Sequence, residues 1–240
     1  MRDHINMCYG EDRKFLKGYR APFSDFKILK MIAILDYRAG NLTSVKRALD
    51  YLGYPSRITS DPKEVIGASR VIFPGVGAAG KAMESLKELG LDEALREVFL
   101  SGRPMMGICL GVQIVFSKSE EDETSCLGLL EGEVRRFPDG MKEGEEVLKV
   151  PHMGWNRVKW VKEHPLNEGI EPEAEFYFVH SYYPDPAKRD WVIGWTDYGI
   201  SFASVIAYRS LVAVQFHPEK SGRPGLRMLD NFCRWRPDAQ

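Results

Sequence analysis

The chain has 240 residues, of which 44% are hydrophobic and 28% are charged, and its formal net charge is -1. This composition is typical of a soluble globular protein and excludes the disordered, fibrous and membrane-spanning classes. A net charge near zero provides no field that attracts nucleic acid or an anionic membrane surface. We therefore expect small molecules or another protein as partners, with no nucleic acid and no membrane.

The first thirty residues are rich in charges and have few clustered apolar positions. They lack the apolar stretch of a secretory signal, which favours a cytoplasmic location. At Met31 the pattern changes to a strand-like apolar run, MIAILDY. We expect residues 1–30 to be an extension that is loosely packed or dispensable, and residues 31–240 to form one domain.

Strand-like and helix-like segments then alternate along the chain. A helical pattern, LTSVKRALDYLGY, follows Gly40-Asn41, and then come a strand, RVIFP, two helical stretches, KAMESLKELG and LDEALREVFLSG, and a strand, PMMGI. This order indicates parallel strands joined by right-handed crossovers. From about residue 126 shorter strand-like pieces follow, and the helical segment RPGLRMLDNFCRW closes the chain. The pattern predicts an α/β fold: an open mixed sheet, mainly parallel, with helices on both faces.

The four cysteines are far apart in the sequence and form no C-x-x-C pair. This spacing argues against a zinc site and against a disulfide framework, so we expect free thiols and no metal. We also expect no cofactor. They are Cys8, Cys109, Cys126 and Cys233. A free cysteine is ordinarily a small buried apolar residue. Only Cys109 has a sequence context that indicates chemistry.

Cys109 is the centre of a G-x-C-x-G sequence that joins a predicted strand to the helix-like VQIVFSK. Glycines two residues to either side permit a sharp turn that projects the central side chain above the end of the sheet. The turn also puts Cys109 at a helix N-terminus, where the partial positive charge stabilises a thiolate. The pattern predicts a nucleophile elbow.

A base for this nucleophile is available in Gln215-Phe216-His217-Pro218-Glu219, which follows the predicted strand LVAV. Because residues two apart in an extended segment point the same way, Glu219 can hydrogen-bond the imidazole of His217. Cys109, His217 and Glu219 then fill the roles of nucleophile, base and orienting group.

The oxyanion of an acyl-transfer intermediate needs main-chain N–H donors. We expect one from Leu110, directly after the nucleophile, and others from Val76 and Gly77 in the glycine-rich turn PGVG, which follows an earlier strand. Taken singly, the elbow could be a tight turn, PGVG a loop and His217 a structural histidine. Their occurrence together favours the catalytic interpretation.

The segments GICLGVQ and QFHPEKS resemble the class I (triad) glutamine amidotransferases, over residues 31–236. Three further segments, MIAILDYRAGNLTSV, PHMGWN and FYFVHSYY, resemble the glutaminase subunit of imidazole glycerol phosphate synthase. The resemblance implies a flavodoxin-like fold and hydrolysis of L-glutamine through a thioester on Cys109. It also implies a heterodimer with a barrel-shaped cyclase subunit, which uses the ammonia to make imidazole glycerol phosphate and aminoimidazole carboxamide ribotide in histidine biosynthesis.

The same resemblance implies binding roles. The substrate-binding residues would be Gly75, Gln113, His180, Ser181 and Tyr182, and the partner-facing ones Asn41, His152 and Trp155. Structural alternatives are a turn-stabilising amide for Gln113, an edge strand for 180–182, and core packing for His152 with Trp155. The sequence departs from the pattern of this family in two features. One is the presence of the first thirty residues, and the other is Ala79, a position at which relatives usually carry a bulky aromatic residue.

Two other functions remain open on the sequence. One is another branch of the same group, such as the glutaminase of anthranilate or nucleotide synthesis or a γ-glutamyl peptidase that acts alone, against which PHMGWN argues. The other is a catalytically silent scaffold subunit, against which the complete triad argues. A peptidase would turn over without a partner, and a scaffold would never release glutamate.

Overall fold

The structure is a computed structural model that describes residues 31–237; the expected extension, residues 1–30, lies outside the described residues. Its largest element is an eight-stranded sheet. From one edge to the other the strands are β11 (Lys159–Trp160), β14 (Val192–Tyr198), β15 (Ile200–Tyr208), β16 (Leu211–Val214), β4 (Met105–Cys109), β3 (Arg70–Gly75), β1 (Ile32–Leu35) and β2 (Ser56–Thr59).

The five strands from β16 to β2 are parallel, and β15, β14 and β11 are antiparallel to their neighbours. Every residue of β1, β4 and β16 is buried, which explains why these strands are continuous apolar runs in the sequence. The predicted open mixed sheet, mainly parallel and followed by antiparallel strands, is confirmed.

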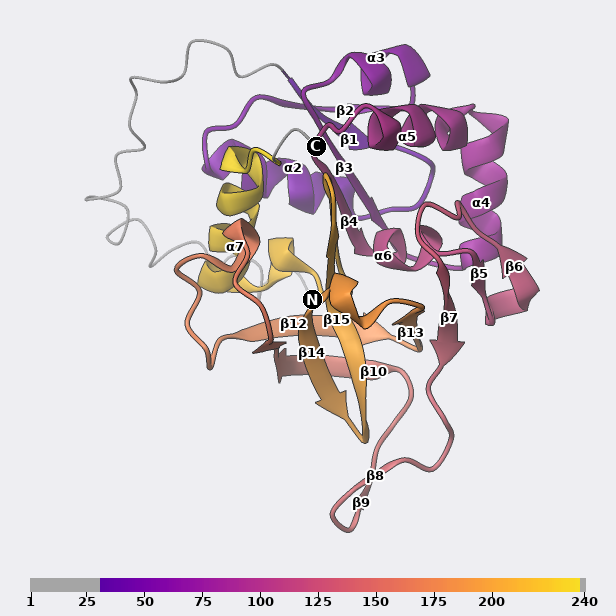
Figure 1. The fold of residues 1–240 in the computed structure, drawn as a ribbon, viewed down its shortest axis with the longest axis vertical. Helices are drawn as coiled ribbons and strands as arrows, with labels where there is room; N and C mark the ends of the chain where they lie inside the picture. The colour runs from indigo at the N-terminus through magenta and orange to yellow at the C-terminus, as the bar shows by residue number, and fades with distance from the viewer. Residues whose placement is uncertain (1–30, 238–240) are drawn as a thin grey trace. The chain divides into compact units, whose positions relative to one another are not determined.

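Helices cover both faces of the parallel part of the sheet (Figure 1). On one side lie α2 (Leu42–Tyr51) and α7 (Gly222–Arg234), which contact each other. On the other side are α3 (Pro62–Gly67), α4 (Ala79–Glu88), α5 (Leu91–Leu100) and α6 (Leu110–Ile114). This second group shares one apolar core with side chains from β1, β3 and β4. The arrangement is the α/β layering predicted from the alternating pattern.

Smaller sheets are attached to this body. One pairs β10 (His152–Arg157) with β12 (Glu175–His180), and another joins β13 (Tyr182–Pro186), β7 (Gly132–Arg136), β5 (Lys118–Ser119) and β6 (Thr124–Ser125). A two-stranded hairpin, β8 (Lys142–Glu143) with β9 (Glu146–Val147), projects from the strand-rich half in Figure 1. Four 3-10 turns complete the described elements: η3 (Glu121–Glu123), η4 (Pro165–Asn167), η5 (Arg189–Trp191) and η6 (Pro218–Lys220).

The structure differs from the sequence prediction in two places. Strand β2 and helix α3 are short elements that the pattern did not indicate, and β2 is only partly buried. The helix expected to continue through VQIVFSK ends at Ile114. Its last carbonyls, those of Ile114 and Val115, accept hydrogen bonds from main-chain N–H groups of 127–130, so no further helical turn uses them.

Within residues 31–237 no helix combines the length and the apolar character needed to span a bilayer.

Candidate active site

The predicted elbow is present where β4 meets α6. Cys109 ends the strand with φ 54° and ψ -106°, a conformation that side-chain-bearing residues rarely adopt and that costs on the order of 1–3 kcal/mol. The flanking glycines make the turn possible. A Cβ on Gly107 would come within 2.8 Å of the Gly111 backbone, and one on Gly111 would come within 2.2 Å of the Phe73 carbonyl oxygen. Strand and helix therefore pack too closely for any larger residue at either position.

His217, the predicted base, lies at the same edge of the sheet because β16 is directly beside β4. The His217 main-chain N–H donates to the Tyr177 carbonyl at 2.9 Å, and the His217 backbone is extended at φ -103°. Its Nδ1 lies 2.8 Å from Oε1 of Glu219, and both side chains are buried. The predicted geometry, with Glu219 two residues beyond His217 and on the same side, is the geometry observed.

The surroundings of His217 favour the charged form of its imidazole. Burial lowers its pKa, but the charge of a Cys109 thiolate and the Glu219 carboxylate outweigh burial and raise the pKa to about 10. With Nδ1 donating to Glu219, the other ring nitrogen, Nε2, is buried and lacks a hydrogen-bond partner among residues 31–237. This nitrogen is therefore available to the thiol or to a reacting substrate.

Side chains beside the sulfur include one that the sequence analysis did not assign. Sγ of Cys109 lies 3.9 Å from Nε2 of Gln215 and 3.9 Å from the Val179 carbonyl oxygen. Gln215 is fully buried and accepts from Nε2 of Gln113, which also donates to the Tyr182 carbonyl at 3.1 Å. The signal for Gln215 was its place in QFHPE, two residues before His217 and therefore on the same side of an extended segment.

The glycine-rich turn also lies beside Cys109, because Gly75 at the end of β3 is the register partner of this residue. In this conformation the Val76 N–H donates to the Ala39 carbonyl at 2.8 Å, and Gly77 has φ +106°. Leu110 is the first residue of α6, and N–H groups of a first helical turn have no acceptor within the helix. Of the expected donors, the N–H of Val76 is thus occupied by the main chain.

Two buried histidines, His180 and His152, form a chain of hydrogen bonds. Nδ1–H of His180 donates to the Tyr182 carbonyl at 2.8 Å, which leaves Nε2 of His180 as an acceptor. This Nε2 accepts from Nδ1–H of His152 at 3.1 Å. The remaining nitrogen of His152, Nε2, faces the Asn156 amide at 3.3 Å. Burial lowers the pKa of His152 to about 4. Burial, and next the positive charge that His152 carries when protonated, lower the pKa of His180 to about 3. Both rings are neutral near pH 7. Ser181, which lies between His180 and Tyr182 in the sequence, is partly exposed.

The three residues expected to face a partner have different surroundings. His152 is 3% exposed and stacks on Phe178 and Tyr198, so its side chain lies in the core of this chain. Trp155 is 52% exposed. Asn41 is half-buried, and its side-chain amide donates to Oε1 of Glu219, a contact that the sequence analysis did not anticipate.

Ala79, the departure noted in the sequence, is fully buried, and its main-chain N–H donates to Oε2 of Glu121 at 2.7 Å. Cys109, Cys126 and Cys233 are free thiols, whereas Cys8 lies outside the described residues. Residues 31–237 hold no cluster of three or more His, Cys, Asp or Glu side chains suited to a metal ion.

Comparisons with known proteins agree with this architecture. Residues 33–235 match the family model of glutamine amidotransferase class-I. Among solved structures, PurLQS from Thermotoga maritima superposes with a TM-score of 0.66 at 14% identity, covering 85% of this chain and 98% of that one. A glutamine amidotransferase from Thermotoga maritima gives a TM-score of 0.60 at 16% identity, covering 85% and 83%. These two likenesses concern the fold.

Sequence relatives are much closer. The imidazole glycerol phosphate synthase subunit HisH of Nitratidesulfovibrio vulgaris strain DP4 is 55% identical over 210 residues, which cover 87% of this chain and 98% of the relative. The same subunit from Dehalococcoides mccartyi strain CBDB1 is 49% identical over 205 residues, covering 85% and 97%.

Fold, elbow and family model together define the class, a glutamine amidotransferase of class I. Within that class, the chain belongs to the family of HisH subunits of imidazole glycerol phosphate synthase.

Proposed function

We propose that this chain hydrolyses L-glutamine to L-glutamate and ammonia as the glutaminase subunit of imidazole glycerol phosphate synthase, in histidine biosynthesis. The observation that carries the proposal is the strained turn of Cys109 beside the buried His217–Glu219 pair. A cysteine in a rare backbone conformation next to a charged imidazole is the arrangement that nucleophilic catalysis requires.

The two reaction steps follow from these groups. The Cys109 thiolate attacks the γ-carboxamide carbon of glutamine, and the imidazolium of His217 gives the proton that lets ammonia leave, which yields a γ-glutamyl thioester. A water molecule then attacks the thioester carbonyl while His217 takes up its proton, and glutamate leaves as the thiolate is restored. Glu219 holds Nδ1 of the ring, so that Nε2 faces the reacting atoms.

The tetrahedral intermediates of both steps carry an oxyanion. We assign its donors to the main-chain N–H groups of Leu110, Val76 and Gly77, since the register of Gly75 with Cys109 brings the glycine-rich turn beside the nucleophile. The N–H of Val76 must first leave the Ala39 carbonyl to take part. The glycines on either side of Val76 make such a rotation of the peptide feasible.

Glutamine would bind along the edge formed by the elbow, the turn and the end of β12. Gln113 and Gly75 lie next to the nucleophile, and we assign to them contacts with the reacting end of the substrate. Ser181 and Tyr182, which are partly exposed, would bind the amino-acid end. Both ring nitrogens of His180 are already bonded within the protein, so we assign it to holding this segment in place.

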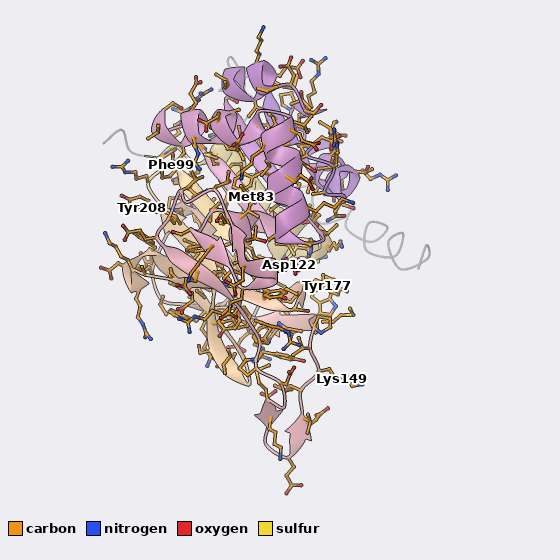
Figure 2. The ribbon with its side chains drawn as sticks, turned by 90° about the vertical axis from the view of Figure 1, so that its right-hand side faces the viewer. Met83, Phe99, Asp122, Lys149, Tyr177 and Tyr208 are labelled. Carbon is orange, nitrogen blue, oxygen red and sulfur yellow. The ribbon has the colours of Figure 1, made fainter. Side chains whose placement is uncertain are left out.

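We propose the sheet formed by β10 and β12 as the surface that meets a barrel-shaped cyclase subunit in a heterodimer. Met153 is 62% exposed and Trp155 52%, and Trp155 lies opposite Tyr177 with 6.0 Å between the ring centroids. Tyr177 is labelled in Figure 2, where it lies in the strand-rich half below the helices. Exposed Trp, Met and Tyr side chains are enriched at protein interfaces.

This apolar face is continuous with the active site. Val179 pairs with Met153 across the two strands, and its carbonyl oxygen lies 3.9 Å from the Cys109 sulfur. A partner seated on β10 and β12 would cover the nucleophile and receive ammonia out of contact with water, which would otherwise protonate it. Asn41 belongs to the same edge through its contact with Glu219. The proposed location of the complex is the cytoplasm.

The occupied N–H of Val76 leads to a proposal about activation. An oxyanion donor that points at a main-chain carbonyl does not stabilise the intermediate, so the isolated chain should hydrolyse glutamine slowly. The cyclase subunit together with its nucleotide ligand would favour the productive orientation. A change from 1:99 to 99:1 requires a differential binding free energy of about 5 kcal/mol, which an interface together with a phosphate-bearing ligand can supply.

The test is glutamate release measured for the chain alone, with the cyclase subunit, and with both this subunit and its nucleotide ligand. The proposal predicts a rise of orders of magnitude in the third mixture. Full activity of the isolated chain would contradict the activation step, and no release in any mixture would contradict the glutaminase assignment.

A further inference from the structure

The hydroxyl group of Tyr37 has no hydrogen-bond partner among residues 31–237, although the residue is only 1% exposed. Tyr37 follows β1 and lies in the same apolar core as Leu35 and Phe73. Phenylalanine would fill this position without a polar atom to satisfy. Buried hydroxyl groups in folded proteins are nearly always hydrogen-bonded, so the unpaired oxygen requires an explanation.

The position of this hydroxyl gives the explanation, because it lies against Gly75 in the glycine-rich turn. A Cβ built on Gly75 would come 2.0 Å from the Tyr37 hydroxyl oxygen and 3.1 Å from Cβ of Leu110. Gly75 is also the register partner of Cys109. The hydroxyl therefore lies against Gly75, at a point that the side chain of Leu110 also approaches, and both segments are ones to which we assign oxyanion donors.

The orientation of one peptide group in the turn determines what this hydroxyl can reach. The Val76 N–H donates to the Ala39 carbonyl. The Gly75 carbonyl belongs to the same planar trans peptide, in which C=O and N–H point in opposite directions. In this conformation the Gly75 carbonyl thus points away from Ala39. Rotation of the peptide to present the Val76 N–H to a substrate would turn the Gly75 carbonyl toward the segment 37–39.

A carbonyl turned toward that segment needs a donor there. At the point of contact Ala39 presents the carbonyl oxygen that Val76 has just left, and this oxygen cannot donate. The Tyr37 hydroxyl is in contact with Gly75 and is unpaired. We propose that Tyr37 is a positioning residue whose hydroxyl donates to the Gly75 carbonyl when the Gly75–Val76 peptide adopts its productive orientation. The inference rests on the proposed function, which makes this turn part of the oxyanion hole.

The protonation state of the hydroxyl fits this role. Burial and the negative charge of Cys109 raise the pKa of Tyr37 above its ordinary value, so the group remains a proton donor throughout the working range of the enzyme. Since Tyr37 acts on the orientation of a donor and not on the substrate, its loss should lower kcat and leave KM for glutamine nearly unchanged.

The experiment compares Tyr37→Phe with the wild-type chain, each in complex with the cyclase subunit in the presence of its nucleotide ligand. We expect kcat for glutamate release to fall about tenfold in the variant, the effect of leaving one buried carbonyl unpaired. We expect KM within about twofold of wild type, and a melting temperature of the isolated variant no lower than wild type, because the hydroxyl makes no bond in the resting conformation.

Tyr54→Phe is the matched control. Tyr54 is also buried, but its hydroxyl donates at 2.6 Å to Asp230 in α7 and not to the glycine-rich turn. This variant should lose thermal stability and keep the wild-type kcat in the complex. The opposite pattern in the two variants, stability lost in one and turnover lost in the other, is the signature of the proposed role.

Two results would overturn the inference while the proposed function stands: an unchanged kcat in Tyr37→Phe, or a fall in its activity that is matched by a fall in melting temperature. A wild-type complex that releases no glutamate would overturn the proposed function, and the inference with it. The wild-type measurement separates the two failures.

Discussion

The side-chain amide of Asn41 donates to Oε1 of Glu219, the same carboxylate oxygen that holds Nδ1 of His217. Asn41 thus connects the segment after β1 with the His217–Glu219 pair, across 178 positions of sequence. It is in the left-handed region at φ 64°, so a substitution must keep that backbone conformation if the role of the amide is to be isolated. Glycine meets this condition.

We predict that Asn41→Gly lowers kcat for glutamate release about tenfold, because one charge-assisted hydrogen bond to Glu219 is removed. Asn167→Gly serves as the control and should retain wild-type turnover, since the amide that it removes donates to the Lys162 carbonyl and not to the triad. Steady-state kinetics of both complexes measure the difference. Equal kcat in Asn41→Gly and wild type would show that the contact does not position the base.

The members of the triad should differ in their importance. His217→Ala should reduce glutamine hydrolysis by more than about a thousandfold, close to the loss in Cys109→Ala, because nucleophile and base act as a unit. Glu219→Gln should cost at least about tenfold less, since the main-chain bond to Tyr177 still holds the His217 backbone in place and the nucleophile and base remain. His217→Ala with wild-type hydrolysis would end the triad assignment.

The source of ammonia can be tested separately from its use. In Cys109→Ala the assembled synthase should lose glutamine-dependent synthesis and keep synthesis with added ammonium salts, because only the supply of ammonia depends on the thiol. Loss of both activities, with the complex still assembled on a sizing column, would contradict this division of labour.

Much of this site was predictable because its determinants are local. The glycines around Cys109 and the spacing of His217 and Glu219 each specify a turn or a face from a few neighbouring residues, and the alternating pattern specifies the parallel sheet that brings them together. Contacts between distant segments were not predictable. The bond from Asn41 to Glu219, the position of Gln215 beside the sulfur and the unpaired Tyr37 hydroxyl depend on three-dimensional packing.

His152 shows that a sequence motif can suggest a location without indicating which face of a strand a side chain occupies. Its segment PHMGWN led us to expect it at the interface with a partner, and in this chain its ring is buried against His180 while Met153 and Trp155 face outward. Alternation along β10 accounts for the difference between His152 and Met153, since neighbouring residues of a strand point to opposite faces. The motif alone did not indicate which face each residue takes.

The buried histidines predict how stability depends on pH. The folded-state pKa values of His152 and His180, about 4 and about 3, are below the unfolded value of 6.5, so the unfolded chain binds more protons between these limits. Stability should therefore fall from pH 7 to pH 5, by on the order of 2 kcal/mol for each histidine. Burial also lowers the pKa of His164, which adds to the effect. The raised pKa of His217 changes the free energy of unfolding only above pH 6.5, where the unfolded chain loses a proton that the folded chain retains.

Denaturant melts at pH 5, 6 and 7 measure this slope, in a window where ordinary carboxylates titrate little. His152→Gln keeps an amide donor for His180 and removes one titrating group, so its slope should be shallower than that of the wild type. A wild-type free energy of unfolding that is equal at pH 5 and pH 7 would show that these rings are not held neutral.

Deletion of residues 1–30 should leave melting temperature and glutaminase activity nearly unchanged. The first strand is already tied to the body of the domain, because Ile32 N–H donates to the Pro55 carbonyl at 3.0 Å and the Met31 carbonyl accepts from Ser69 at 3.1 Å. A chain that starts at Met31 and melts well below the full chain would assign a structural role to the first thirty residues.

The central claim is that glutamine is hydrolysed through a covalent intermediate on Cys109. The most direct measurement is acid quenching of the active complex during turnover, followed by mass spectrometry of the peptide that contains Cys109. The account predicts a γ-glutamyl group on Cys109 in the wild type and its absence in Cys109→Ala, which should release no glutamate. Glutamate release by Cys109→Ala, or the adduct on Cys126 or Cys233 instead, would contradict it.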